Sequence, residues 1–131
     1  MLETENIIIK NMSKKQQDIC DIASDLAKKS DMEKSKHGAV IVNGKKIIGM
    51  GYNRYCSNKT CYTTHAEVDA ILDAVNTYGK EALSNSELYV IRICNKEKNL
   101  SRPRLRLSKP CEACTNFIVK NKIKMVYYSI D

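Results

Sequence analysis

The sequence is organised around residues 63–70, Thr-Thr-His-Ala-Glu-Val-Asp-Ala. This stretch places the imidazole of His65 and the carboxylate of Glu67 two residues apart, where an apolar helical pattern begins. A second stretch, residues 109–114, reads Lys-Pro-Cys-Glu-Ala-Cys and supplies two thiols three residues apart. Together the two stretches present imidazole, carboxylate and thiol groups, which are the groups of a metal site with an acid–base residue beside it.

A catalytic zinc ion accounts for this set of groups. Zinc takes thiolate and imidazole ligands in a tetrahedron, and a catalytic zinc keeps one position open for water. Cys111 and Cys114 share one side of a helical turn, and Pro110 suits a first helical position, where the helix dipole favours thiolate. We therefore predict His65, Cys111 and Cys114 as zinc ligands and Glu67 as the catalytic proton carrier.

Each motif also has a simpler interpretation. A lone Cys-x-x-Cys pair is found in redox centres and in halves of structural zinc sites. Thr64 and Glu67 have the spacing of a helix capping box, in which Glu67 would only cap a helix. The order of His, Glu, Pro and two Cys in one chain favours the catalytic zinc over either interpretation.

Composition sets the broad class of the protein. The 131 residues suit one domain over 1–131, and 43% of them are hydrophobic. The net charge of +7 favours phosphate-bearing ligands without separating a nucleotide from a polymer. No apolar run approaches the ~20 residues of a membrane helix, and the acidic start differs from a signal peptide. We expect a cytoplasmic protein with no membrane partner, and reduced thiols at the remaining cysteines, Cys20, Cys56, Cys61 and Cys94.

The order of predicted elements gives the fold class. Residues 1–12 form an arm or an edge strand, and a helix over 13–29 opens with a Ser13–Gln16 capping box. A hairpin follows, with strands over 38–42 and 45–51 and a turn at Asn43-Gly44. A helix from His65 to Gly79, a strand over 87–94, a helix from Pro110 to 121 and a strand over 124–130 complete the chain. This order predicts a three-layer α/β/α sandwich, with a mixed sheet of about four strands and both zinc helices on one face.

Two further regions carry candidate functions. The loop over 54–62 holds Cys56 and Cys61, which could bind a second metal only with more ligands than the sequence offers nearby. Residues 95–109 contain six basic residues against the single acid Glu97. This basic segment leads into Pro110, so we expect Arg102, Arg104 and Arg106 to hold a substrate phosphate or a nucleic-acid backbone, with a solvated loop as the alternative.

The chain resembles the cytidine deaminase superfamily over most of its length. The resemblance rests on His65-Ala66-Glu67, as in the deoxycytidylate branch, on Pro110-Cys-x-x-Cys and on Gly51-Tyr52-Asn53. It implies that Asn53 contacts the substrate sugar, that the Ala66 amide binds the base carbonyl and that the Lys109 carbonyl accepts from the departing amine. It also implies a shortened C-terminus, because the family core usually continues past its fourth strand, and a homo-oligomer in which a second subunit covers the exposed sheet edge.

The predicted function is zinc-dependent hydrolytic deamination of a cytosine nucleotide or nucleoside, with deoxycytidylate to deoxyuridylate as the expected reaction. Two alternatives remain. One is deamination of single-stranded DNA or RNA, although residues 95–109 contain no aromatic side chain for base stacking. The other is a non-catalytic binding module stabilised by zinc, which would have no need of a carboxylate at Glu67.

Overall fold

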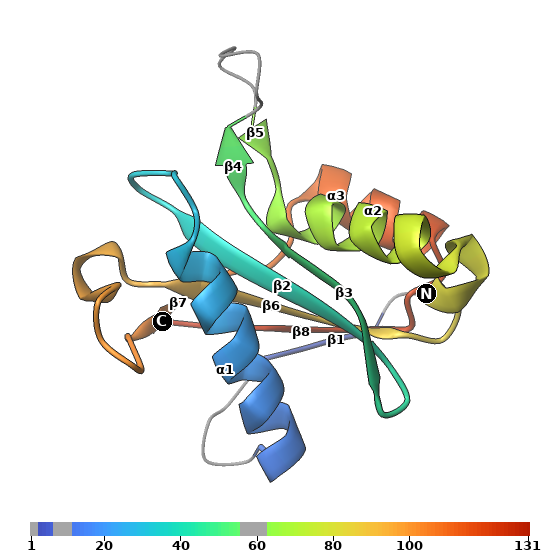
Figure 1. Cartoon of the computed structure of the whole chain (residues 1–131), viewed down its shortest axis with the longest axis horizontal. Helices are drawn as coiled ribbons and strands as arrows, with labels where there is room; N and C mark the ends of the chain where they lie inside the picture. The colour runs from blue at the N-terminus through green and yellow to red at the C-terminus, as the bar shows by residue number, and fades with distance from the viewer. Residues whose placement is uncertain (1–2, 7–11, 56–62) are drawn as a thin grey trace.

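The computed structural model describes residues 3–6, 12–55 and 63–131. Cys56 and Cys61, where a second metal was considered, lie outside these ranges. Three helices and one principal sheet make up the fold (Figure 1). The helices are α1 (Lys14–Lys28), α2 (Ala66–Tyr78) and α3 (Glu112–Lys120), with short 3₁₀ turns η2 (Lys80–Leu83) and η3 (Asn95–Glu97). The strands are β1 (Glu3–Asn6), β2 (Lys36–Asn43), β3 (Lys46–Tyr52), β4 (Arg54–Tyr55), β5 (Thr63–Thr64), β6 (Glu87–Ile93), β7 (Leu105–Arg106) and β8 (Met125–Tyr128).

The principal sheet is mixed, as predicted, but it has six strands instead of about four. Its order is β1-β8-β6-β2-β3, and β7 also pairs with β6. β1 and β8 run parallel to β6, whereas β2 and β7 run antiparallel to it. The additional strands are the short β1 and β7. β1 lies in the segment that was predicted as an arm or an edge strand, and β7 lies in the alternating run Arg104-Leu105-Arg106-Leu107. β1 of this chain pairs with β8 and lies along its outer edge. The homo-oligomer stays a prediction.

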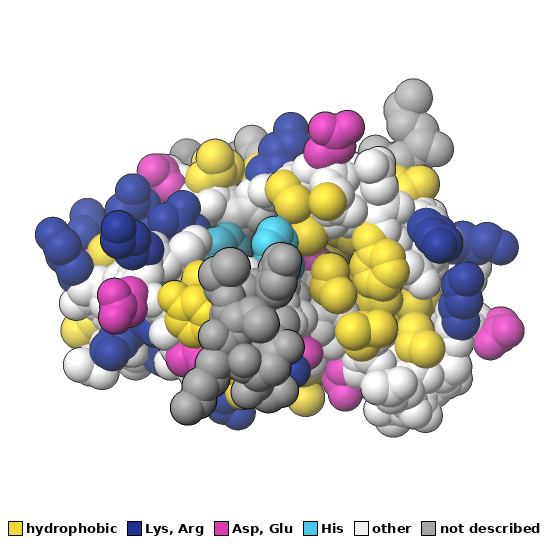
Figure 2. Space-filling model, turned by 90° about the horizontal axis from the view of Figure 1, so that it is seen from above, with side chains coloured by type: hydrophobic (Ala, Val, Ile, Leu, Met, Phe, Trp, Pro, Cys, Tyr) yellow, Lys and Arg dark blue, Asp and Glu magenta, His cyan; other side chains and the backbone are white. Residues whose placement is uncertain are grey.

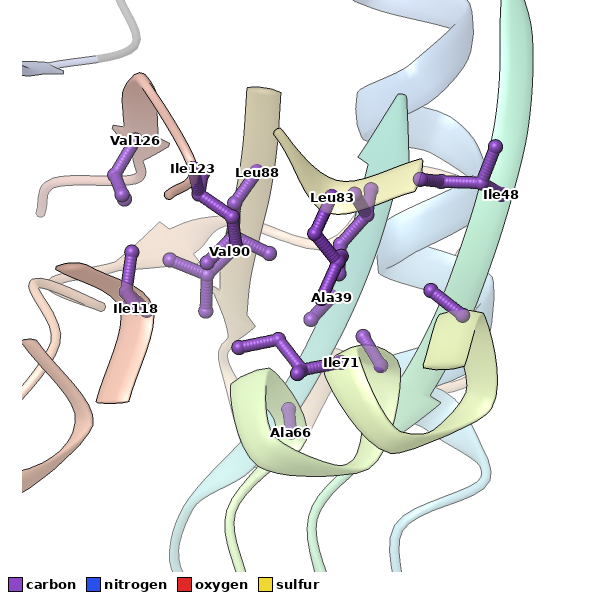
Figure 3. Packing of buried hydrophobic residues seen from close by; sticks show 13 residues of the cluster. Ala39, Ile48, Ala66, Ile71, Leu83, Leu88, Val90, Ile118, Ile123 and Val126 are labelled. Carbon is purple, nitrogen blue, oxygen red and sulfur yellow. The ribbon is translucent and has the colours of Figure 1, made fainter. Parts of the chain in front are cut away.

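The three layers follow from alternation along the central strands. On β2, Val40 and Val42 face α1, whereas Ala39 and Ile41 face α2. On β6, Tyr89 and Ile91 join the α1 side, and Leu88 and Val90 join the α2 side. Figure 3 shows the hydrophobic cluster on the α2 side of the sheet. In it, Ala66 and Ile71 of α2 pack against these strands, and Ile118 of α3 lies beside them. The three-layer sandwich is therefore confirmed, with α1 on one face and α2 and α3 on the other.

Glycine lets the helices approach the hairpin closely. A Cβ on Gly38 of β2 would lie 1.9 Å from the Ala23 carbonyl oxygen of α1. A Cβ on Gly49 of β3 would lie 2.4 Å from the Ala70 carbonyl oxygen of α2. No real side chain tolerates either distance, so these positions fix how near the helices sit to the sheet.

Two predicted element starts shift by one or two residues. The hairpin turn consists of Gly44-Lys45, and Asn43 still pairs with Lys46 in the ladder. Gly44 has φ +63°, which suits the first position of a two-residue turn. Helix α3 begins at Glu112, so Pro110 precedes the helix and Cys111 is its N-cap. The Ser13–Gln16 capping box of α1 is present as predicted. Within the part of the chain that the structure describes, no helix is both long and apolar enough to cross a membrane.

Candidate active site

The starts of α2 and α3 bring the two sequence motifs together. His65 is the N-cap of α2 and Cys111 is the N-cap of α3, both with extended backbone angles. Neither side chain makes a capping hydrogen bond, so both are directed away from the helix they begin. Thr64 is therefore not the N-cap of α2, and the capping-box interpretation of Glu67 is wrong. Cys114 lies one turn into α3 and is buried.

The three predicted ligands form a compact cluster. Their donor atoms all lie within 4.8 Å of one another. His65 Nδ1 is 3.1 Å from Cys114 Sγ and 3.9 Å from Cys111 Sγ. Ligand atoms of a tetrahedral zinc site lie about 3.5–3.8 Å apart, given Zn–S near 2.3 Å and Zn–N near 2.0–2.1 Å. The donor set, two sulfurs and one nitrogen, fits zinc, and the two distances lie just below and just above the range for a tetrahedral site.

Glu67 lies beside this cluster without belonging to it. Its side chain is only 5% exposed, although it is a carboxylate in the first turn of α2. Burial raises the pKa of Glu67, against the opposing effects of its own backbone amide and of His65. A buried carboxylate with a raised pKa can hold and release a proton closer to neutral pH than an exposed one.

Burial also governs the thiol of Cys114. Its pKa is raised by burial first and then by the nearby charge of Glu67. Burial therefore opposes the effect that the helix N-terminus is expected to have on the Cys114 thiol. Coordination to zinc deprotonates a thiol outright, so the donor remains suitable for a metal.

A cavity of about 240 Å³ opens next to the cluster. Its walls include the predicted residues Asn53, His65, Ala66, Glu67, Lys109 and Cys111. They also include residues that the sequence analysis did not assign to the site, namely Met32, Ser35, His37, Thr63 and Ser108. Figure 2 shows the histidine side chains near the middle of this face, with Lys and Arg side chains grouped at both ends of the molecule, one of which carries the loop between β6 and β7.

His37 enters the site from the first residues of β2. Alternation along β2 could have identified it, because residue 37 shares the face of Ala39 and Ile41, which is the face covered by α2. Burial and the nearby Arg92 lower the pKa of His37 to about 4, so its imidazole is neutral at physiological pH. A neutral imidazole can both donate and accept a hydrogen bond.

Asn53 fixes the wall that contains His37. Its side-chain oxygen accepts from the His37 amide at 2.8 Å, and its side-chain amide donates to the Ser35 carbonyl. Its own backbone amide donates to the His37 carbonyl at 3.2 Å. Asn53 lines the cavity as the family resemblance implies, and it also shapes the cavity through these bonds.

Arg54 and Asp69 connect the β4–β5 ribbon to α2. The guanidinium makes two bonds to the carboxylate, at 2.7 and 2.8 Å, and the same carboxylate accepts from the Tyr52 amide at 3.1 Å. The Asp69 amide bonds the His65 carbonyl within the first turn of α2. Asp69 therefore links the end of β3, through the Tyr52 amide, and β4, through Arg54, to the first turn of α2, whose N-cap is His65.

The arginines of the basic segment are placed elsewhere. Arg102 pairs with Asp21 of α1 at 3.1 Å, on the opposite face of the sheet from α2. Arg104 pairs with Glu97, and Arg106 pairs with Asp131 at 3.4 Å. None of the three is among the residues that line the cavity. Lys109 is the single lysine or arginine among the described lining residues.

Comparison with solved structures agrees with this fold. The chain has 21% identity and a TM-score of 0.69 to the crystal structure of apo dCMP deaminase from cyanophage S-TIM5, covering 92% of this chain and 88% of that one. It is 26% identical, with a TM-score of 0.60, to guanine deaminase from Bacillus subtilis, over 91% of this chain and 65% of that one. These folds define a class of nucleobase deaminases built on the same sandwich.

Sequence relatives narrow the class to a family. The chain is 30% identical over 112 residues to the deoxycytidylate deaminase of Mycobacterium phage D29, which covers 82% of this chain and 88% of the relative. The family model of the cytidine and deoxycytidylate deaminase zinc-binding region matches residues 13–130. The chain belongs to this family, and the resemblance identified from its motifs is confirmed.

Proposed function

We propose that this protein is a zinc-dependent hydrolase that deaminates deoxycytidylate to deoxyuridylate and ammonia. The observation that carries the proposal is the position of Glu67, which is buried beside the His65, Cys111 and Cys114 cluster and lines the same cavity. A purely structural zinc site has no use for a buried carboxylate at its open side, whereas a hydrolytic site requires one to move protons.

The residues of this chain then have distinct roles. His65, Cys111 and Cys114 hold the metal, which when bound supplies the Lewis acidity that activates water near neutral pH. Glu67 takes one proton from water and delivers it to N3 of the pyrimidine as the water oxygen bonds to C4. It then transfers the second proton from that oxygen to the amine nitrogen, and the C4–N bond breaks to release ammonia. Ala66 and Lys109 both line the cavity. This supports the roles that the family resemblance implies, in which the Ala66 amide binds the base carbonyl and the Lys109 carbonyl accepts from the departing amine. Asn53 and His37 line the cavity, and we assign the substrate sugar to their side of it.

A nucleotide substrate is supported by two facts. The phage relative is named as a deoxycytidylate deaminase, and the S-TIM5 enzyme was also solved in complex with dCMP and dUMP. In this chain Lys109 is exposed and lines the cavity, and we propose that its ammonium pairs with the substrate phosphate. We assign the phosphate contact to Lys109, and the contribution expected from Arg102, Arg104 and Arg106 stays a prediction that the experiments below compare with it.

The test is a substrate panel. Zinc-loaded protein is incubated with deoxycytidylate, cytidylate, their nucleosides, guanine, and single-stranded DNA and RNA, and ammonia release and product are measured. We expect the highest kcat/KM for deoxycytidylate. Deamination of single strands without turnover of any monomer would overturn the proposal in favour of a polynucleotide deaminase. Zinc binding with no deamination of any member would favour the non-catalytic module.

A further inference from the structure

One edge of β6 is shared by two strands that run in opposite directions. β2 occupies one edge along the whole of β6. On the other edge, β8 pairs in parallel from Glu87 to Val90, and β7 pairs antiparallel at Arg92 and Ile93. The ladder therefore changes direction around Ile91. Backbone groups at such a junction need partners that neither ladder provides.

Two buried serines fill this junction. Ser108 is 3% exposed and Ser129 is fully buried. The Ser108 hydroxyl donates to the Val90 carbonyl at 2.7 Å and accepts from the Ser129 amide at 2.8 Å. The Ser129 hydroxyl donates to the Arg106 carbonyl at 2.6 Å and accepts from the Arg92 amide at 3.0 Å.

The bonds between the serines are reciprocal. The Ser108 amide donates to the Ser129 carbonyl at 2.9 Å, and the two hydroxyl oxygens are 2.8 Å apart. Each hydroxyl hydrogen is accounted for by a backbone carbonyl, so neither is left to bind a ligand in the cavity. We call this arrangement, made by Ser108 and Ser129 with Val90, Arg92 and Arg106, the serine latch.

The serine latch lies immediately before the metal-binding segment. Ser108 is in the cavity wall and is followed by Lys109, Pro110 and Cys111. At the C-terminal end of this segment, the Thr115 amide of α3 donates to the Cys111 carbonyl at 2.8 Å. The segment that carries a ligand and a predicted substrate contact is thus fixed at one end by α3 and at the other by the latch.

We propose that Ser108 and Ser129 are positioning residues, which set the place of the Cys111 thiol and the Lys109 backbone by closing the β7–β8 junction. The proposal rests on the metal site of the proposed function. It predicts that loss of the latch perturbs the metal geometry and the chemistry more than an equivalent loss of a buried serine elsewhere. Outer residues that hold a ligand in place typically contribute about 10–100-fold to metal affinity or activity.

Ser86 provides a matched control. It is fully buried, and its hydroxyl donates to a backbone carbonyl, that of Leu83, at 2.6 Å. It precedes β6 and does not line the cavity, whose wall residue His37 pairs with Arg92 near the other end of that strand. Ser86→Ala removes a buried hydroxyl before the start of β6, whereas Ser108→Ala removes one that bonds Val90 in the middle of β6.

The experiment compares wild type, Ser108→Ala and Ser86→Ala as cobalt(II)-substituted proteins. Cobalt affinity, the visible d–d spectrum and thermal stability are measured, together with kcat and KM for deoxycytidylate. We expect both variants to lose stability. Only Ser108→Ala should shift the d–d bands, bind cobalt about tenfold or more weakly and lose kcat.

A wild-type spectrum and affinity in Ser108→Ala, with the same loss of stability as Ser86→Ala, would overturn the proposal. If Ser108→Ala does not fold, Ser129→Ala keeps the Ser108 bonds to Val90 and to the Ser129 amide, and it should show the same spectral shift at smaller size. An unshifted spectrum in that variant would also overturn the proposal. The cobalt measurements do not depend on turnover, so failure of the proposed reaction in wild-type protein remains distinguishable from failure of the latch.

Discussion

Residues 95–114 contain two adjacent regions with opposite arrangements. From Ser108 onward, side chains or backbone groups converge on one cavity beside Glu67. Before Ser108, each of the three arginines of the basic segment forms an ion pair with a different carboxylate away from the cavity. The converging part is fixed by buried contacts, namely the serine latch and the first turn of α3. The spreading part is held by exposed ion pairs, which contribute little to stability. The comparison shows that the residues gathered at the cavity are not the arginines that carry half of the positive charge of residues 95–109.

The largest expected effect is the loss of activity on replacing the carboxylate at the cavity, compared with replacing the carboxylate of the basic segment. Glu67→Gln keeps the shape of a buried side chain and removes the proton carrier, so deamination should fall by roughly 10²–10⁴-fold while zinc remains bound. Glu97→Gln, the control, removes the single carboxylate of the basic segment and its bond to Arg104, and it should leave turnover near wild type. Steady-state kinetics and metal analysis on both variants check this. Loss of zinc in Glu67→Gln would mean that the carboxylate is structural.

A second effect concerns the buried histidine of the cavity. The pKa of His37 is lowered to about 4, below the ordinary value of 6.5, so the unfolded chain binds its proton more readily than the folded one. The stability that neutral His37 retains at pH 7 is therefore lost as the pH falls from about 6.5 toward 4. Between pH 7 and pH 5 this group alone should lower the free energy of unfolding by about 2 kcal/mol.

Urea denaturation of wild type and His37→Gln at the two pH values isolates this contribution. The variant should lose less stability on acidification than wild type, because glutamine does not titrate. The same change with pH in both proteins would show that His37 is not held neutral by its surroundings. The arginines of the basic segment are exposed. Neutralising them should therefore leave the pH dependence of the free energy of unfolding unchanged.

A smaller effect tests which cations meet the substrate. Lys109→Met should raise the KM for deoxycytidylate about tenfold with little change for deoxycytidine, since one charge-assisted contact is lost. Neutralising Arg102, Arg104 and Arg106 together should have less effect, because their carboxylate partners lie away from the cavity. If the triple variant instead raises the KM for deoxycytidylate more than Lys109→Met does, with deoxycytidine unchanged, the three arginines hold the substrate phosphate as first predicted. Salt-sensitive binding of single strands that disappears in the triple variant would instead favour the polynucleotide alternative.

The same contrast explains what could be predicted from the sequence. His65, Glu67, Cys111 and Cys114 are close in sequence to helix starts, where local geometry determines their direction, and the structure brings them together as expected. Alternation along β2 indicates the face of His37, but the cavity on that face, like the place of Ser108, depends on strand pairing between distant segments. The arginines were assigned by counting charge, and charge alone does not say which way an exposed side chain turns. The short strands β1 and β7 also depend on partners far along the chain.

The most direct test of the central claim measures metal and turnover on the same preparations. Wild type, Cys114→Ala and Cys94→Ala are compared, because Cys94 is also a buried free thiol but lies outside the cluster. We predict one zinc per chain and deoxycytidylate deamination in wild type and Cys94→Ala, with both lost in Cys114→Ala. Stoichiometric zinc with undiminished deamination in Cys114→Ala would contradict the account.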